Sequence, residues 1–247
     1  MSRSRPAENK AKNPASMFIE WKSNEEAFTH YVKDEDGTGK NVKLPLDTKF
    51  IVLDQLSTVT GFDDSYGVRY WSNEVRYVGK DELAICVFVK GKDKSKVKVL
   101  KKGTWKEIKG KTDAKYAKSI YAMAKIDDEY QLVNIKLAGA CLTSWITFLE
   151  KIGGDSAIYG ETVVSVDKVE KMKKGAVNYT TPIFKIASKK LSQEAMDKAM
   201  ELDATLQTYL DQYLETKQSP ALAEESTEEV IEEEPDLTEE EGDLPPF

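Results

Sequence analysis

The amino-acid sequence predicts a mainly β protein, a predominantly antiparallel sheet or barrel that two helices interrupt. From Lys43 onward, short runs rich in β-branched and aromatic side chains follow one another along the chain. Clusters of Gly, Asp, Lys and Ser separate these runs, as expected for turns between strands. The runs do not alternate with helical segments, which argues against an α/β fold.

The predicted strands have the length and the apolar content of half-buried strands. They are residues 49–56, 68–78, 83–90, 96–100, 104–108, 116–126, 130–139, 162–172 and 178–188.

Two segments show helical periodicity. In residues 140–152, the spacing of Leu142, Trp145, Ile146 and Leu149 predicts a helix that packs on the core. Residues 192–216 begin with Ser192 as an N-cap and carry one apolar stripe of Ala195, Ala199, Leu202, Leu206, Tyr209 and Tyr213. This second helix closes the folded body and is also suited to packing against another subunit.

Acidic and basic residues are separated along the chain. From Glu224 to Asp243 there are twelve Asp and Glu and no Lys or Arg. Without these twelve, 31 acidic residues stand against 36 basic ones, so residues 1–223 carry a net charge of +5 although the whole chain carries −7. A basic body with an acidic tail is typical of nucleic-acid-binding proteins, but acidic tails that only keep a protein soluble show the same pattern.

This division predicts a flexible basic arm (residues 1–16), one folded domain (17–217) and a disordered acidic tail (218–247). The carboxylates of the tail repel one another and have little apolar surface to bury. The tail nevertheless ends in a small apolar tip, which is suited to docking in a partner's pocket. The residues of this predicted partner-binding tip are Asp243, Leu244, Pro245, Pro246 and Phe247.

The cysteine and histidine content excludes several kinds of site. Cys86, Cys141 and His30 are the only residues of these types, so the chain has neither a zinc cluster nor a sensible Cys/His catalytic pair. Both cysteines lie in apolar runs and are expected to be buried, reduced thiols. With no signal peptide and no apolar stretch near ~18 residues, we expect a soluble intracellular protein.

A lysine-rich segment is the most informative part of the interior. From Lys90 to Lys118 there are twelve Lys against Asp93, Glu107 and Asp113, a net charge of +9. Alternation in residues 96–100 sends Lys96 and Lys98 to one face and Val97 and Val99 to the other. Such a row of lysines can follow a phosphate backbone, although it also serves as a solvated strand edge that prevents aggregation.

Aromatic residues accompany these cations, and the combination indicates single-strand binding. Bases stack on exposed rings at ~1–3 kcal/mol each while Lys and Arg neutralise phosphates. In the run 68–77, Arg69, Trp71 and Asn73 share one strand face, and Tyr70, Ser72 and Glu74 share the other. The predicted DNA-binding groove comprises the cations Arg69, Arg76, Lys96, Lys98, Lys101, Lys102, Lys106, Lys109 and Lys118 and the rings Tyr70, Trp71, Tyr77, Trp105, Tyr116 and Tyr121.

The motifs of common enzyme classes are missing from the sequence. It has no GxxxxGK[ST], GxSxG or HExxH pattern. The pair Asp63 and Asp64 could hold a metal ion, but a turn between two strands explains it more simply. We therefore expect a protein that is not an enzyme and that needs no cofactor and no metal.

Two features resemble known single-stranded DNA-binding proteins. The acidic tail ending in Phe247 resembles the tails of the bacterial and phage proteins, which dock replication proteins and compete with DNA. The stretches LPLDTKFIVLDQLSTVTGFDD, YWSNEV, KSIYAM and LAGACLTSWITF, between about Leu44 and Leu149, resemble a group of phage-encoded members. The resemblance implies an OB-fold-type barrel with extra hairpins and helices, and a role in phage replication, recombination or repair in the host cytoplasm.

The expected function is therefore sequence-independent binding and protection of single-stranded DNA, with replication or recombination proteins as partners of the tail. A strand-annealing recombination protein, a phage assembly or chaperone-like protein and a metal-dependent nuclease stay open as alternatives. Oligomeric state stays open as well. RNA is not distinguished from DNA, because stacking and phosphate contacts serve both unless a site senses the 2′-OH.

Overall fold

The computed structural model describes residues 12–33, 38–63, 67–89, 96–188 and 190–218. Mainly β structure is confirmed. The strands are β1 (Met17–Lys22), β2 (Ala27–Lys33), β3 (Gly39–Lys43), β4 (Phe50–Asp63), β5 (Val68–Ser72), β6 (Leu83–Val89), β7 (Lys96–Gly103), β8 (Lys115–Ile126), β9 (Glu129–Ala138), β10 (Val163–Lys174) and β11 (Val177–Ser188). The helices are α1 (Trp105–Ile108), α2 (Gly139–Ile152) and α3 (Gln193–Gln218), with a 3-10 turn at Asp155–Ile158.

The strands begin earlier than the sequence predicted, because β1, β2 and β3 precede Lys43 or end at it. Ile19 and Phe28 are buried and anchor this meander to the core. The described part of the predicted arm also contacts the body. Asn13 Nδ2 donates to Tyr121 Oη at 3.1 Å, Ser16 N donates to Leu132 O at 2.9 Å, and Ala15 is buried.

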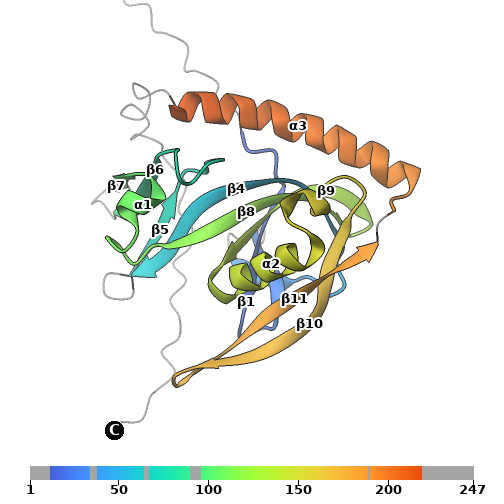
Figure 1. Cartoon of the computed structure of the whole chain (residues 1–247), viewed down its shortest axis with the longest axis horizontal. Coiled ribbons are helices and arrows are strands. Elements are labelled where there is room, and N and C mark those ends of the chain that lie inside the picture. Colours follow the sequence, from blue (N-terminus) through green and yellow to red (C-terminus); the bar gives the residue numbers. More distant parts are fainter. Residues whose placement is uncertain (1–11, 34–37, 64–66, 90–95, 189, 219–247) are drawn as a thin grey trace, which may run out of the picture.

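One sheet runs through the molecule in the order β3-β2-β1-β9-β8-β4-β5-β6-β7, and β10 joins β4 and β11 beside this path (Figure 1). The pair β1–β9 is parallel and the other pairs are antiparallel, so the sheet is mixed. Among the described residues the path ends at β3 and β7 without a ladder between them. The expected OB-fold-like antiparallel barrel is therefore not confirmed, since the sheet is mixed and is not closed within the described residues.

Strand β4 organises the sheet because its fourteen residues exceed the usual strand length of roughly 3–10. It pairs with β8 along most of its length, with β5 at its C-terminal end and with β10 at Phe50. A register shift between Val52 and Asp54 bends it. Because of this bend, one strand contributes Phe50 and Val52 to the main core and Val59 to a second hydrophobic cluster.

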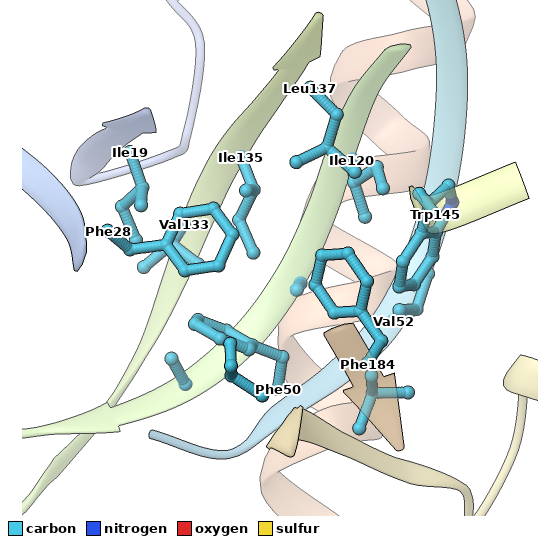
Figure 2. Packing of buried hydrophobic residues seen from close by; sticks show 14 of the residues in the cluster. Ile19, Phe28, Phe50, Val52, Ile120, Val133, Ile135, Leu137, Trp145 and Phe184 are labelled. Carbon is cyan, nitrogen blue, oxygen red and sulfur yellow. The ribbon is translucent and has the colours of Figure 1, made fainter. Parts of the chain in front are cut away.

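The main core lies between the sheet, α2 and β11 (Figure 2). Trp145 stands edge-on to Phe184 with ring centroids 5.0 Å apart, and Leu142 and Leu149 are buried as the helical spacing predicted. Ile146, expected in the same contact, is 42% exposed and does not belong to it. The void between these rings is about 10 Å³, roughly the size of one water, so the core has no room for a ligand.

Helix α3 covers the opposite side of the sheet (Figure 1). Neighbouring residues of β8 show the division, because Ile120 belongs to the core under α2 while Tyr121 packs against Leu206 and Leu210 of α3. The predicted stripe is confirmed, and Ser192 Oγ accepts a hydrogen bond from Ala195 N at 3.2 Å as an N-cap.

Candidate nucleic-acid interface

The strands β5, β6 and β7 form an antiparallel extension of the sheet beyond β4. One side of this extension is packed. Tyr70, Ile85 and Val87 join Val59 in a second hydrophobic cluster, which α1 covers through Ile108. The other side carries Trp71, Cys86 and Val99 in one row, as the pairing of Trp71 with Cys86 and of Cys86 with Val99 shows. This second side faces away from the cluster.

Three rings lie on this outward side. Trp71 and Phe88 have ring centroids 5.8 Å apart with planes inclined by 33°. Phe62, on β4, points to the same side because it alternates with Gly61, which pairs with the inward Tyr70. Phe62 is 55% exposed and Phe88 is 38% exposed, so both rings present apolar surface to solvent.

Cations share this side of the sheet. Arg69 lies opposite Phe62, Lys102 lies opposite Ala84, and Lys115 lies opposite Thr60. All three are exposed. We call the combined surface the aromatic face; it consists of Phe62, Arg69, Trp71, Phe88, Lys102 and Lys115.

Trp71 contains an unsatisfied donor. Its Nε1 has less than 1 Å² of exposed area and no hydrogen-bond partner among the described residues. A buried polar group without a partner costs roughly 1–3 kcal/mol. Because the Nε1 atom is closed to solvent, the part of Trp71 that a surface ligand can contact is its ring and not its N–H.

The sheet curls toward the side of the aromatic face. Arg69 Nη2 lies 3.6 Å from Glu20 Oε2, although β5 and β1 are separated by β9, β8 and β4. In a flat sheet, four spacings of ~4.8 Å would place these strands about 19 Å apart, farther than the two side chains reach. The ion pair therefore crosses a concave surface. Its side chains are 57% and 33% exposed, so it contributes little stability and can be exchanged for another anion.

The other predicted lysines lie outside the aromatic face. Lys98 and Lys101 pair with inward residues of β6 but are exposed at the sheet edge, and Lys106 and Lys109 are exposed on or beside α1. Lys118 is half-buried on β8, and the side chain of Lys96 lies outside the described residues. The segment 104–108, predicted as a strand, is the helix α1 because Thr104 and Glu107 form a capping box.

Two predicted stacking residues are buried, which corrects the prediction for them. Tyr70 is 6% exposed in the second cluster, and Tyr121 is 0% exposed beneath α3. Tyr121 Oη donates to Glu74 Oε2 at 2.8 Å, and burial together with that carboxylate raises the pKa of Tyr121. Neither ring can stack on a base, because Tyr70 faces the second cluster and Tyr121 lies on the sheet side of Lys115 but is covered there by α3.

Arg76 was also predicted to contact DNA, but its guanidinium is already engaged. Its two terminal nitrogens donate to Asp54 Oδ1 and Oδ2 at 3.0 and 2.9 Å, and the pKa of Arg76 is raised by this hydrogen bonding. Gln207 of α3 donates to the same carboxylate at 3.2 Å. Arg76 therefore joins β4 to α3.

The remaining predicted rings have mixed settings. Trp105 and Tyr116 are half-buried with centroids 5.9 Å apart, and Tyr116 Oη is 2.9 Å from Ser57 Oγ. Tyr77 is 64% exposed, with Lys80 Nζ 5.9 Å from its ring centroid. Tyr77 is therefore the most accessible ring of the predicted set, outside the aromatic face.

The structure unites Arg69, Trp71 and Lys102 of the predicted set and adds three residues that the sequence analysis missed, Phe62, Phe88 and Lys115. Phe88 lies in an apolar run that resembles core, and Phe62 lies between Gly61 and Asp63 at what reads as the end of a strand. The available signal was alternation along each strand. Phe88 is two residues from Cys86, which pairs with Trp71, and Phe62 follows Gly61, which pairs with the inward Tyr70.

Other kinds of site find little support in the described ranges. There, no three His, Cys, Asp or Glu residues lie close enough to hold a metal ion. Asp64 and the side chain of Asp63 fall outside these ranges, as do the tail residues Asp243 to Phe247. None of the helices in the described part of the chain combines the length and apolarity needed to cross a bilayer.

A comparison of the chain with protein-family models, with curated proteins and with solved structures finds no match.

Proposed function

We propose that the chain binds single-stranded DNA without sequence preference and that the aromatic face is its contact surface. The observation that carries this proposal is the placement of three rings and three cations on one side of the strands β4 to β8, where Phe62, Phe88 and the cations are exposed and Trp71 is half-buried. Tyr70 and Tyr121, in contrast, are buried, Tyr70 in the second cluster and Tyr121 under α3.

The chemistry of the surface suits a single strand. Each base offers a π-face, and stacking on an aromatic ring contributes ~1–3 kcal/mol whatever the base. Arg69, Lys102 and Lys115 would neutralise phosphates. In a duplex the π-faces are stacked on one another, so the same surface would discriminate against double-stranded DNA.

The order of the elements supports an OB-type relationship as part of the proposal. If β5–β7 are left aside, the chain runs through β4, β8, β9, α2, β10 and β11 in that order, and β10 pairs with β4. In this interpretation β5–β7 are an insertion and β1–β3 an N-terminal addition. OB-folds commonly bind oligonucleotides, although the fold alone does not determine the activity.

The acidic tail has its own part in the proposal. Its carboxylates would compete with DNA for Arg69 and the neighbouring lysines, and the tip from Asp243 to Phe247 would recruit replication or recombination proteins. In this proposal the protein would act in DNA replication, recombination or repair, in the host cytoplasm that the resemblance of its tail implies. Phe247 would supply an apolar side chain to such a partner.

The decisive experiment is a fluorescence-anisotropy titration of labelled oligo-dT and of a matched duplex across a salt series. We expect single-strand preference and a steep salt slope, because phosphate neutralisation releases counterions. Trp71→Ala and Phe88→Ala should each weaken binding about 5- to 150-fold, the equivalent of ~1–3 kcal/mol of stacking. The matched control is Tyr31→Ala, which removes a ring that is 39% exposed on β2.

Equal affinity for single strand and duplex, or unchanged affinity in both ring variants, would refute the proposal. An oligo-RNA arm determines whether the surface senses the 2′-OH. Mixing complementary strands in the same buffer tests annealing as the alternative activity, and incubation of DNA with magnesium or manganese tests the nuclease.

A further inference from the structure

The β10–β11 hairpin is half core and half free arm. Val163 to Val166 are buried, whereas the side chains from Asp167 to Lys174 are exposed apart from the half-buried Val169. The ladder from Lys168–Ile183 to Lys174–Val177 continues without irregularity, and Gly175, with φ of 61°, begins a two-residue turn. Figure 1 shows this outer half extending away from α3.

The arm is fixed at its middle to the turn between β1 and β2. Thr180 N donates to Ser23 Oγ at 2.6 Å, and Thr180 Oγ1 donates to Ser23 O at 2.7 Å. Trp21 Nε1 donates to Thr180 O at 3.0 Å. An isolated two-stranded hairpin is marginally stable in water, so these bonds hold the arm at a set position.

Between the arm and this turn lies an open groove of about 820 Å³. The volume is within the range of roughly 300–1,000 Å³ that accommodates a drug-sized ligand. Lys171 and Lys173 supply cations, Asn24 and Asn178 supply amide donors and acceptors, and Met172 and Tyr179 supply apolar contact. Glu26 is the acidic group in this lining, and it lies 3.7 Å from Lys171.

Apolar exposure at the tip also indicates a ligand. Val177 is 65% exposed and Met172 is 41% exposed, and they lie beside Lys174 and Tyr179 through the pairs Lys174–Val177 and Met172–Tyr179. Residues 168–174 contain Lys168, Lys171, Lys173 and Lys174 against Glu170, a net charge of +3. Apolar contacts amid cations suit a strand that has both bases and phosphates.

A series of contacts links this groove to the aromatic face. Arg69 reaches Glu20 at 3.6 Å, and Lys22 Nζ lies 3.8 Å from the same Glu20 oxygen. Ser23, which holds Thr180, follows directly. At ~3.3 Å per residue, about 10 Å of backbone separates Glu20 from Ser23, so the groove begins just beyond the end of the strand that carries the Glu20–Arg69 pair.

We propose that this groove is a second contact site for the same DNA strand. The phosphodiester backbone would replace Glu26 beside Lys171 and would contact Lys173 and Lys174, while a base would pack on Tyr179 and Met172. The Glu26–Lys171 pair is no obstacle, because its side chains are 47% and 83% exposed and such pairs are weak. The inference rests on the proposed function and extends the strand beyond the aromatic face.

The experiment compares a short and a long oligo-dT, of about 6 and about 30 nucleotides, chosen around the ~4–16 nucleotides that one OB-type domain covers. The variant is Lys171→Ala/Lys173→Ala/Lys174→Ala in the full chain. The matched control, Lys33→Ala/Lys151→Ala/Lys190→Ala, removes three exposed lysines that do not line the groove. The long oligonucleotide should bind the variant more weakly with a salt slope lower by about 2, since each single-strand phosphate contributes ~0.7. The short one should bind as to the wild-type protein.

Each other outcome is decisive. A variant that binds the long oligonucleotide like the control, with the same salt slope, would show that the hairpin lysines contact solvent and would overturn the second site alone. An equal loss for both lengths would also overturn it, because the groove would then not be a separate contact. Absence of binding by the wild-type chain at both lengths would overturn the proposed function and this site with it. Tyr179→Ala, with the lysines intact, gives a second measurement that leaves charge unchanged.

Discussion

Replacing Arg76 by Ala removes the partner of a buried carboxylate. The Asp54 side chain is 10% exposed, and after the substitution it keeps hydrogen bonds from Gln55 N at 2.7 Å and Gln207 Nε2 at 3.2 Å. Breaking a buried ion pair from one side costs ~3–5 kcal/mol. Because the Arg76 side chain is 33% exposed and two donors remain, we expect a loss of about 2–3 kcal/mol in unfolding free energy.

Thermal unfolding measures this loss. For a domain of this size, ~1 kcal/mol lowers Tm by roughly 2–4 °C, so Arg76→Ala should melt about 4–12 °C below the wild-type protein. Arg69→Ala is the matched control, since its pair with Glu20 is longer and more exposed and such pairs contribute ~0–1 kcal/mol. Its Tm should stay within about 4 °C of the wild-type value.

In DNA binding we expect the opposite order of effects, with the larger loss for Arg69→Ala. At a temperature where both are folded, Arg76→Ala should retain the affinity for oligo-dT, whereas Arg69→Ala should weaken it and lower the salt slope by ~0.7. An Arg76→Ala protein with wild-type Tm and impaired DNA binding would refute the structural assignment. The double variant Asp54→Ala/Arg76→Ala should lose less stability than the sum of the single variants, because it leaves no unpaired charge.

Three further predictions concern the core, the tyrosines and the tail. Phe184→Ala should lower the unfolding free energy by ~3–5 kcal/mol in urea titration, and an unchanged midpoint would contradict the packing of Phe184 on Trp145. Burial raises the pKa of Tyr209 to about 12, above ~10 in the unfolded chain. Its contribution to stability is therefore complete below pH 10 and lost as the pH rises toward 12. Absorbance at 295 nm should show Tyr209 ionising only at the upper end of this window, and full ionisation of a native protein near pH 10 would contradict it. A chain ending at Lys217 should bind oligo-dT more tightly than the full chain at low salt and equally at high salt, where charges are screened; equal binding at both would exclude competition by the tail.

The sequence predicted most strands and both long helices because their patterns are local. Period-two and period-3.6 alternation can be recognised within a window, as the confirmed stripe of α3 illustrates. The failures involve information that is not local. Residues 104–108 have strand-like composition, but one side-chain contact between Thr104 and Glu107 begins a helix turn. The parallel β1–β9 pair joins segments more than a hundred residues apart.

The site was predicted in part for the same reason. Alternation correctly separated Arg69 and Trp71 from Tyr70, but it did not determine which side of β5 packs against the cluster around Ile85. That choice depends on what covers each side of the sheet. Arg76 looks like a surface cation in sequence, yet its partner Asp54 comes from β4 and is fixed by Gln207 of α3, 131 residues away from Arg76 along the chain.

The placement of Phe62 and Phe88 has a consequence for how the surface is built. Both rings belong to strands whose opposite side is core, so their positions are set by the same ladder that packs Tyr70 and Val87. A stacking platform of this kind is fixed by the fold before any ligand arrives, and little ordering entropy is lost on binding. The β10–β11 arm has no such core beneath its outer half and depends on Ser23 and Thr180 for its position. If both contact the strand, Ser23→Ala should weaken binding of long oligo-dT while short oligo-dT binds unchanged, because the arm would lose its anchor and the aromatic face would not.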